Sequence, residues 1–295
     1  MFAAALSLSL TACAGSLTDT TNYDASIVIK GSDTEVQLVS NLAQEFSEMH
    51  PDADMSVTGG GSAVGIAALI NGEADLANSS RAMKEEELQQ AEDRGLSVQE
   101  FILARDGLSV IVHPESPIST LSMAQLRGLY DGTIKNWKAV GGPDAPVVLY
   151  GRQSTSGTFG FFRDVVVQAD YAPTMRQMEG TQAIVDGVKA DRNSIGYVGV
   201  GYIKDRIGEL KVLTISDGGA PMSSLDKEAV LAGRYPIARP IYQYLPHAPA
   251  KDSALHEFLL FEASDAGQAI VEETGFYPTT AEDQAANAAF FESIK

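Results

Sequence analysis

The chain alternates short β-type runs with helical runs, and the connections between them are short. Residues 27–29 form an apolar β run, and the apolar positions within 36–46 recur at the spacing of one helix face. A second unit follows, with a β run at 54–58 and a small apolar helix at 63–70. Repeated strand–turn–helix units predict an α/β fold with mainly parallel central sheets flanked by helices.

The turns that join these strands to the helices are rich in hydroxyl groups. Gly-Ser-Asp-Thr occupies residues 31–34, Gly-Gly-Gly-Ser occupies 59–62, and Ala-Asn-Ser-Ser-Arg at 77–81 closes a third β run. In a mainly parallel sheet such turns gather at the carboxyl edge, which is where ligands bind. Several polar turns at one edge are harder to explain as independent helix caps than any one of them.

The turn at residues 152–158, Arg-Gln-Ser-Thr-Ser-Gly-Thr, concentrates hydrogen-bond donors for an anion between a β run and an apolar helical run. Backbone N–H groups at a helix N-terminus favour negative charge. The hydroxyls of Ser156 and Thr158 and the rigid fork of Arg152 add donors suited to a tetrahedral oxyanion. Gly157 would let the backbone approach a ligand closely. The alternative interpretation is an ordinary serine cap of a helix, with no ligand.

Two extended stretches, at 101–112 and 235–244, divide the chain into two lobes. We expect a discontinuous lobe 1 made of residues 25–112 and 240–295, and a lobe 2 made of residues 113–239. Two hinge crossings of this kind allow a pair of lobes to close around a ligand. The packed part of the chain is expected to end near Pro278.

Residues 1–24 are expected to form a signal peptide and a tether. Residues 1–13 are apolar, too short to span a membrane, and of the right length for the core of a signal peptide. They end in Leu-Thr-Ala-Cys, which resembles the lipobox of bacterial lipoproteins, where the cysteine is lipidated. Cys13 is the only cysteine, so the chain has no internal disulfide. The alternative is a buried apolar segment with an incidental cysteine.

Composition restricts the class of ligand and partner. The 295 residues are 44% hydrophobic and 20% charged, which indicates a globular chain long enough for two lobes. The formal net charge of -18, from 39 acidic and 21 basic residues, argues against nucleic acid or an anionic membrane surface as a partner. An anionic ligand would therefore need a local site built from dipoles and one or two arginines.

Together these turns resemble the phosphate-specific substrate-binding proteins of ABC importers, which have the type II periplasmic-binding-protein fold. The matching stretches are 30–34, 59–62, 77–81, 133–137, 152–158 and 275–278. The resemblance implies a monomeric, non-catalytic receptor without cofactor or metal, in the periplasm or at the cell surface, attached to the membrane only by a lipid on Cys13. It also implies that inorganic phosphate and the permease subunits of an ABC transporter are its partners.

The resemblance implies a phosphate-binding set drawn from both lobes. The set comprises Ser32, Asp33, Thr34, Ser62, Ser80, Arg81, Arg152, Ser156, Gly157 and Thr158. Position 81 departs from the best-known members, which carry an aspartate there to accept the proton that phosphate retains, because arginine cannot accept a hydrogen bond. We hypothesise that Asp33 supplies the acceptor and that Arg81 adds a second positive charge. Asp33 could also act simply as a helix N-cap.

Three alternative functions remain open at this stage. Arg81 keeps open a receptor for sulfate, molybdate or tungstate, because sulfate carries no proton and needs no acceptor. A hydrolase or phosphotransferase with Ser156 as nucleophile is disfavoured, since Gly-x-Ser-x-Gly is absent around that serine. The histidines are also scattered without metal-type spacing, at positions 50, 113, 247 and 256. A sensor or adhesion module that keeps the fold is the third alternative.

Overall fold

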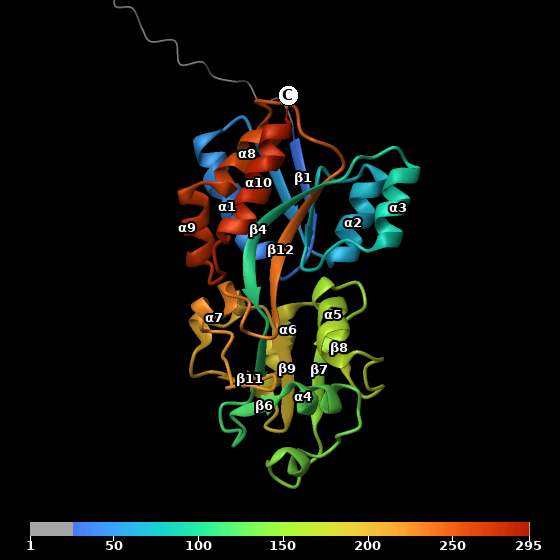
Figure 1. The fold of residues 1–295 in the computed structure, drawn as a ribbon, viewed down its shortest axis with the longest axis vertical. Helices are drawn as coiled ribbons and strands as arrows, with labels where there is room; N and C mark the ends of the chain where they lie inside the picture. The colour runs from blue at the N-terminus through green and yellow to red at the C-terminus, as the bar shows by residue number, and fades with distance from the viewer. Residues whose placement is uncertain (1–25, 295) are drawn as a thin grey trace, which may run out of the picture.

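The computed structural model describes residues 26–294, which form two lobes joined by crossing strands (Figure 1). The sheet of lobe 1 has the order β2 (Asp54–Thr58), β1 (Ser26–Gly31), β3 (Leu76–Ser79), β12 (Ala238–Leu245), β4 (Gln99–Gly107). The sheet of lobe 2 has the order β10 (Lys211–Val212), β5 (Ser109–Val112), β9 (Ser194–Val198), β7 (Val148–Arg152), β8 (Arg176–Met178). A separate pair is formed by β6 (Thr120–Ser122) and β11 (Thr214–Ser216).

Helices flank both sheets. Those of lobe 1 are α1 (Val36–Met49), α2 (Ser62–Asn71), α3 (Glu85–Asp93), α8 (Ala254–Ala263), α9 (Asp265–Glu273) and α10 (Ala281–Ser293). Lobe 2 contains α4 (Met123–Tyr130), η1 (Trp137–Val140), α5 (Gly157–Phe162), η2 (Arg163–Val167), α6 (Thr181–Ala190), η3 (Val200–Tyr202) and η4 (Lys204–Arg206), and α7 (Lys227–Leu231) lies beside the crossing. In Figure 1, α2 and α3 lie on one side of the first sheet, with α1, α8 and α9 on the other. Across residues 26–294, every helix is too short or too polar to span a bilayer.

Each sheet has one reversed strand, and that strand adjoins a crossing. In lobe 1, β1 pairs in parallel with β2 and β3, whereas β12 is antiparallel to both β3 and β4. In lobe 2, β7 pairs in parallel with β8 and β9, whereas β5 is antiparallel to β9 and β10. The other strands of each sheet therefore share one direction. The prediction of a two-lobed α/β fold with mainly parallel sheets is confirmed.

The two crossings lie side by side. The amide of Leu108, between β4 and β5, donates to the carbonyl of Ile237 at 3.0 Å, and Tyr235 Oη donates to the carbonyl of Leu108 at 2.8 Å. The first crossing therefore lies at Leu108, before the expected boundary at Val112. One uninterrupted β run supplies strands to both sheets, and its hydrophobic pattern does not show where the chain changes lobe.

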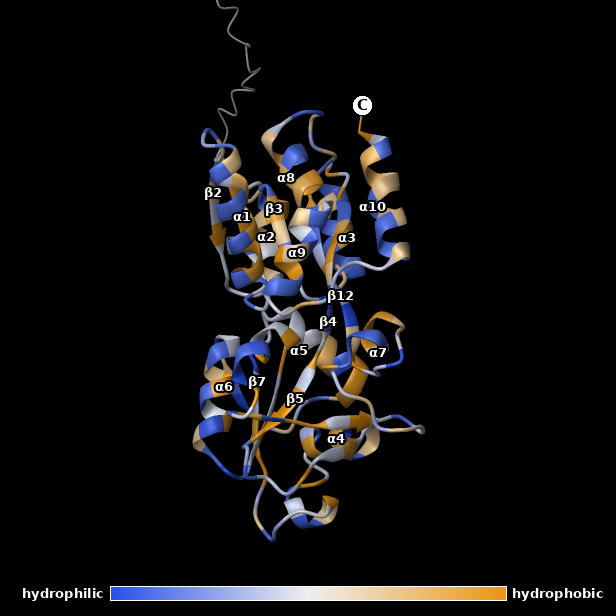
Figure 2. Ribbon diagram, turned by 90° about the vertical axis from the view of Figure 1, so that its left-hand side faces the viewer, coloured by the Kyte–Doolittle hydropathy of each residue, from blue (hydrophilic) through white to orange (hydrophobic). Residues whose placement is uncertain are grey.

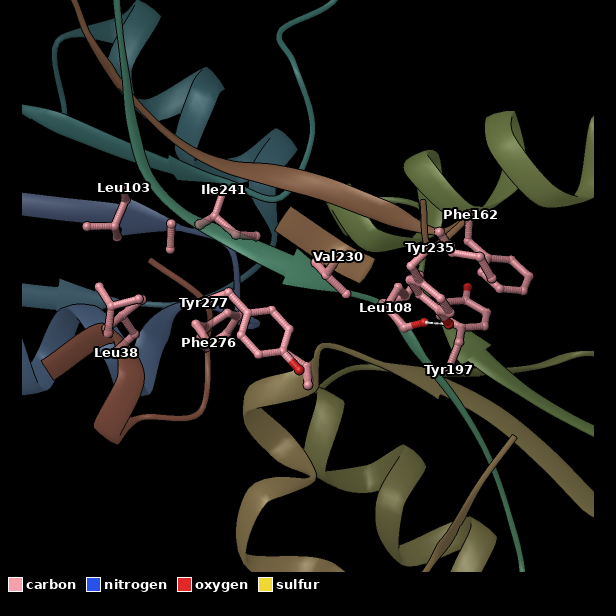
Figure 3. Packing of buried hydrophobic residues seen from close by; sticks show 14 of the residues in the cluster. Leu38, Leu103, Leu108, Phe162, Tyr197, Val230, Tyr235, Ile241, Phe276 and Tyr277 are labelled. Atoms are coloured by element: carbon pink, nitrogen blue, oxygen red, sulfur yellow. Dashed lines mark hydrogen bonds between the residues drawn. The ribbon is translucent and has the colours of Figure 1, made fainter. Parts of the chain in front are cut away.

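The hydrophobic core continues through the crossing (Figure 3). Leu38 and Ile241 pack in lobe 1, Phe162 and Tyr197 stack at 4.0 Å between ring centroids in lobe 2, and Tyr277 lies between the two groups. Helices such as α1 turn their apolar side inward and their polar side outward, as the two colours along that helix show (Figure 2). Burial of a large apolar side chain contributes about 1.5–3 kcal/mol, so this cluster stabilises the lobes and the hinge together.

The expectation that the packed chain ends near Pro278 is wrong, because α10 follows and packs against β4. Asn287 donates to the carbonyl of Ile102 at 2.8 Å and accepts from its amide at 3.0 Å, and Arg105 is paired with Asp283. The helix is rich in alanine and acidic residues, and its apolar stripe is weak. Its attachment depends largely on these polar contacts, which hydrophobic periodicity does not reveal.

Candidate functional site

The hydroxyl-rich turns of both lobes meet where their strands end. Thr34 Oγ1, after β1, lies 3.0 Å from Thr158 Oγ1 at the start of α5 in the other lobe. Ser32 Oγ is hydrogen-bonded to Ser80 Oγ, and Ser62 Oγ accepts from the Ser80 amide at 3.0 Å. All five residues are buried. The structure thus brings together turns that are far apart in the sequence.

Two glycines allow the lobes to approach this closely. A Cβ atom on Gly157 would lie 2.2 Å from Ser62 Oγ across the junction. Gly61 has a φ of +101°, and a Cβ atom there would lie 2.5 Å from the carbonyl oxygen of Thr155. The same carbonyl accepts from the Ala63 amide at 3.0 Å. The N-terminal turns of α2 and α5 therefore face each other at backbone distance, which only glycine permits at these two positions.

Arg152, the last residue of β7, is 1% exposed and is held from three sides. Nη1 donates to Thr181 Oγ1 at 3.0 Å, and Nη2 donates to the Glu179 carbonyl at 2.8 Å and to Asp33 at 2.5 Å. Its Nε has no hydrogen-bond partner among the described residues. Since buried donors are nearly always paired, this N–H is a candidate donor to an anion.

Asp33 joins the two lobes. Its Oδ2 accepts from Arg152, its Oδ1 accepts from the Gly60 amide at 2.9 Å, and its carbonyl accepts from Tyr202 Oη at 2.9 Å. Both carboxylate oxygens thus already have partners within the protein. Each oxygen keeps a second lone pair, so the acceptor role for a ligand proton stays a prediction.

The charge of Arg81 is balanced within its own lobe. Its Nη1 and Nη2 donate to the two carboxylate oxygens of Glu87 at 2.7 and 2.6 Å. Burial alone would raise the pKa of Glu87, but the hydrogen bonds from Arg81 and from the Lys84 amide outweigh it and hold that pKa below its usual value. The stem of Arg81 faces α5, since a Cβ on Gly157 would lie 3.3 Å from Arg81 Cγ. The second positive charge expected from Arg81 is therefore paired with Glu87 within lobe 1.

Sequence reasoning missed Arg239 and Asp106, a fully buried ion pair between the crossing strands. Arg239 Nε and Nη2 donate to Asp106 Oδ2 at 3.0 and 2.7 Å. Arg239 also donates to the Ser80 carbonyl at 2.8 Å and to Thr158 Oγ1 at 3.1 Å. It therefore contacts the hydroxyl cluster, which is formed by Ser32, Thr34, Ser62, Ser80 and Thr158. The available signal in the sequence was that Asp106 and Arg239 each lie in an apolar β run, because charged residues in such runs are rarely buried without a partner.

Removing one partner of this pair should cost much of the stability. In Arg239→Met, Asp106 is left buried without its counter-ion, and we expect a loss of about 3–5 kcal/mol in the free energy of unfolding, measured by urea denaturation. Adding Asp106→Leu should restore part of that loss. The control is Arg192→Met, which removes the exposed pair with Glu115 and should cost less than about 1 kcal/mol. Equal losses in the two arginine variants would contradict the prediction.

Three arginines near the junction are each matched by one carboxylate, and a fourth, Arg206, lines a groove between the lobes together with Asp205 and Glu273. The pairs are Arg152 with Asp33, Arg81 with Glu87, and Arg239 with Asp106. An anion between the lobes would therefore be held by N–H groups, hydroxyls and helix N-termini, with no excess of positive charge. A groove of about 510 Å³, lined by residues of both lobes, opens beside Thr34. This arrangement suits a small tetrahedral oxyanion.

Comparison with known proteins identifies relatives of this chain. A family model described as a PBP superfamily domain matches residues 16–266. The phosphate-binding protein PstS of Pseudomonas aeruginosa is 31% identical over 268 residues, which cover 85% of this chain and 82% of that protein. PstS of Staphylococcus aureus is 30% identical over 275 residues, covering 91% of this chain and 84% of that protein.

Solved structures of similar fold also include proteins described as phosphate-binding or phosphate-transport receptors. A Clostridium perfringens protein solved with bound phosphate has a TM-score of 0.77 and 27% identity, covering 87% of this chain and 100% of that one. An ABC-type phosphate transport receptor from Vibrio cholerae has a TM-score of 0.70 and 27% identity, covering 86% of this chain and 100% of that one. The family model and these long alignments show that the chain belongs to the PBP superfamily and, within it, to the family of PstS phosphate-binding proteins.

Proposed function

We propose that this chain is an extracytoplasmic receptor that captures inorganic phosphate between its lobes and delivers it to an ABC permease. The observation that carries the proposal is the meeting of hydroxyl-rich turns from both lobes, together with the buried Nε of Arg152, which has no partner within residues 26–294. The relatives named as phosphate-binding proteins, and one solved with bound phosphate, support the same ligand. We propose the phosphate-binding set expected from the sequence. Within it, the aliphatic stem of Arg81 packs beside Gly157, while its charge is paired with Glu87.

Capture requires closure but no chemistry on the ligand. The hydroxyls of Thr34 and Thr158 and the N-terminal turns of α2 and α5 belong to opposite lobes, so their donors converge on one anion only when the lobes meet. The side-by-side crossings at Leu108 and Ile237 are the proposed hinge. Because the family consists of transport binding proteins, a hydrolase mechanism through Ser156 has no support.

Calorimetric titration with phosphate tests the ligand. After removal of bound anion by partial unfolding and dialysis, we expect saturable one-to-one binding of phosphate and arsenate and no response to sulfate. Sulfate offers no proton to Asp33, which we propose as the acceptor because each of its carboxylate oxygens keeps a second lone pair. An unpaired buried acceptor against an anion costs about 1–3 kcal/mol or more. Binding of sulfate in preference to phosphate would replace the proposed ligand.

We further propose that the receptor is a monomer anchored in the membrane through a lipid on Cys13. Cys13 lies outside the described residues, and the lipobox-like Leu-Thr-Ala-Cys sequence is the support for this step. Fractionation of cells that express the full chain tests it. The protein should be found with membranes, and Cys13→Ser should shift it to the soluble fraction or leave its precursor uncleaved. A Cys13→Ser protein with unchanged mass and location would contradict the anchor.

A further inference from the structure

A buried acid lies directly behind the hydroxyl cluster. Glu35 is 0% exposed, and its Oε1 accepts from Ser80 Oγ at 3.0 Å. Ser80 Oγ is also hydrogen-bonded to Ser32 Oγ, which in turn accepts from the Thr34 amide at 3.2 Å. Three oxygens therefore form one chain that runs from Glu35 to the junction of the lobes. Glu35 Oε2 has no hydrogen-bond partner among the described residues.

The surroundings of Glu35 favour the neutral acid. The charged and titratable groups that face it are Arg239 and Asp106 from the crossing strands and Glu262 from α8. Arg239 is already matched by Asp106, and Glu262 brings no positive charge. A buried carboxylate with one unpaired oxygen is costly, so it tends to take up a proton instead. Burial raises the pKa of Glu35 to about 8, although hydrogen bonds from Ser80 and Ser32 and the charge of Arg239 oppose this rise.

The protonation of Glu35 determines which way the hydroxyl chain points. Each serine hydroxyl has one proton to donate. An ionised Glu35 can only accept, so Ser80 must donate to Glu35 and Ser32 must donate to Ser80, which leaves Ser32 with only acceptor capacity. A Glu35 protonated on Oε1 donates to Ser80 instead, Ser80 donates to Ser32, and the proton of Ser32 becomes available to an anion.

We propose that Glu35 is a specificity-determining residue, which presents Ser32 to the bound oxyanion as a donor when protonated and as an acceptor when ionised. This inference rests on the proposed phosphate-receptor function and deepens it. It gives Glu35, through the Ser80 and Ser32 hydroxyls, control over whether Ser32 donates or accepts, beside the acceptor role proposed for Asp33. Glu35 is a positioning residue, since it acts on the ligand through the two serines.

The proposal fixes the sign of a pH effect. Below the Glu35 pKa of about 8, the acid is already protonated, so phosphate binding requires no proton uptake by Glu35. We take the ligand oxygen that faces Ser32 to be an unprotonated one, which needs a donor. Above this pKa, Glu35 must then take one proton from the solvent when the oxyanion binds, so the phosphate affinity falls by up to about tenfold per pH unit. Phosphate itself titrates as well, but it does so equally for every variant of the protein. The ratio of wild-type to variant affinity therefore isolates the contribution of Glu35.

Glu35→Gln removes the titration while keeping the shape of the side chain. The amide of the glutamine can donate to Ser80 at every pH, as the protonated acid does. We expect this variant to bind phosphate much like the wild type one unit below pH 8, and up to about tenfold more tightly than the wild type one unit above it. The matched control is Glu262→Gln, because burial also raises the pKa of Glu262 and its Oε1 bonds to Gln243 instead of the serines. This control should follow the wild-type pH profile.

Infrared difference spectroscopy gives a second readout on the wild-type protein. Above pH 8, addition of phosphate should produce the carbonyl band of one protonated carboxyl group in the wild type and in Glu262→Gln, and no such band in Glu35→Gln. Parallel affinity profiles for wild type and Glu35→Gln, or no new carboxyl band in the wild type, would overturn the assignment while leaving the receptor function intact. Failure of all three proteins to bind phosphate at any pH would overturn the receptor function, and this inference with it.

Discussion

Replacing Arg152 by methionine is expected to lower phosphate affinity by about 100-fold. The guanidinium is almost fully buried, and its Nε is the donor that has no partner within the described residues. A hydrogen bond from a charged donor is worth about 1.5–3 kcal/mol, which is roughly 10- to 150-fold in a dissociation constant. The substitution also removes the ion pair with Asp33 that joins the lobes. Calorimetric titration with phosphate measures the loss.

Two further Arg→Met variants give this prediction its controls. Arg81→Met should weaken phosphate binding by less than Arg152→Met, because both Nη groups of Arg81 are already committed to Glu87. Arg176→Met, on β8 of the same lobe as Arg152, removes a hydrogen bond to Tyr150 Oη and should leave phosphate affinity unchanged. A larger loss of phosphate affinity in Arg81→Met than in Arg152→Met would contradict the prediction, and would mean that the charge of Arg81 binds the ligand.

The sequence predicted the elements and turns because those signals are local. The helix expected at 63–70 lies within α2 (Ser62–Asn71), and the β run at 54–58 is Asp54–Thr58. Hydrophobic periodicity determines such elements within a few residues of chain. The turns could be placed together because parallel strands bring their carboxyl ends to one edge. That inference needed no knowledge of which side chains touch.

The partners of the charged residues could not be predicted in the same way. Glu35 lies one position beyond the Gly31–Thr34 turn. Only the packing of Ser80 and Arg239 around it shows that it is buried, with one oxygen that has no partner within residues 26–294. The pairing of Arg81 with Glu87 depends on how α3 begins after β3. Side-chain pairing between distant elements leaves no periodic trace in a single sequence.

The net charge of -18 makes the balance at the junction informative. A chain so acidic repels an anion at long range, and Arg81, Arg152 and Arg239 at the junction are each matched by a carboxylate. Binding must then come from short-range donors that lose their alignment as the lobes separate. Affinity and closure are therefore coupled, and a change that blocks closure should weaken binding even where it touches no donor.

Gly157→Ala is the sharpest test of that coupling. A Cβ atom there would lie 2.2 Å from Ser62 Oγ, so the lobes could not meet as they do here. Overpacking of a close contact costs about 1–3 kcal/mol, and we expect phosphate affinity to fall by about 10- to 100-fold. The clash exists only between the closed lobes, so the thermal midpoint without phosphate should stay near that of the wild type.

Gly219→Ala supplies the matched control, because an added Cβ there meets no atom within 4 Å and should leave phosphate affinity unchanged. Small-angle X-ray scattering then separates closure from folding. With saturating phosphate the wild type and Gly219→Ala should contract, while Gly157→Ala should remain extended at the same phosphate concentration. Full contraction and wild-type affinity in Gly157→Ala would mean that the α2 and α5 termini need not approach this closely, and that the anion is held chiefly by Arg152 and the hydroxyls.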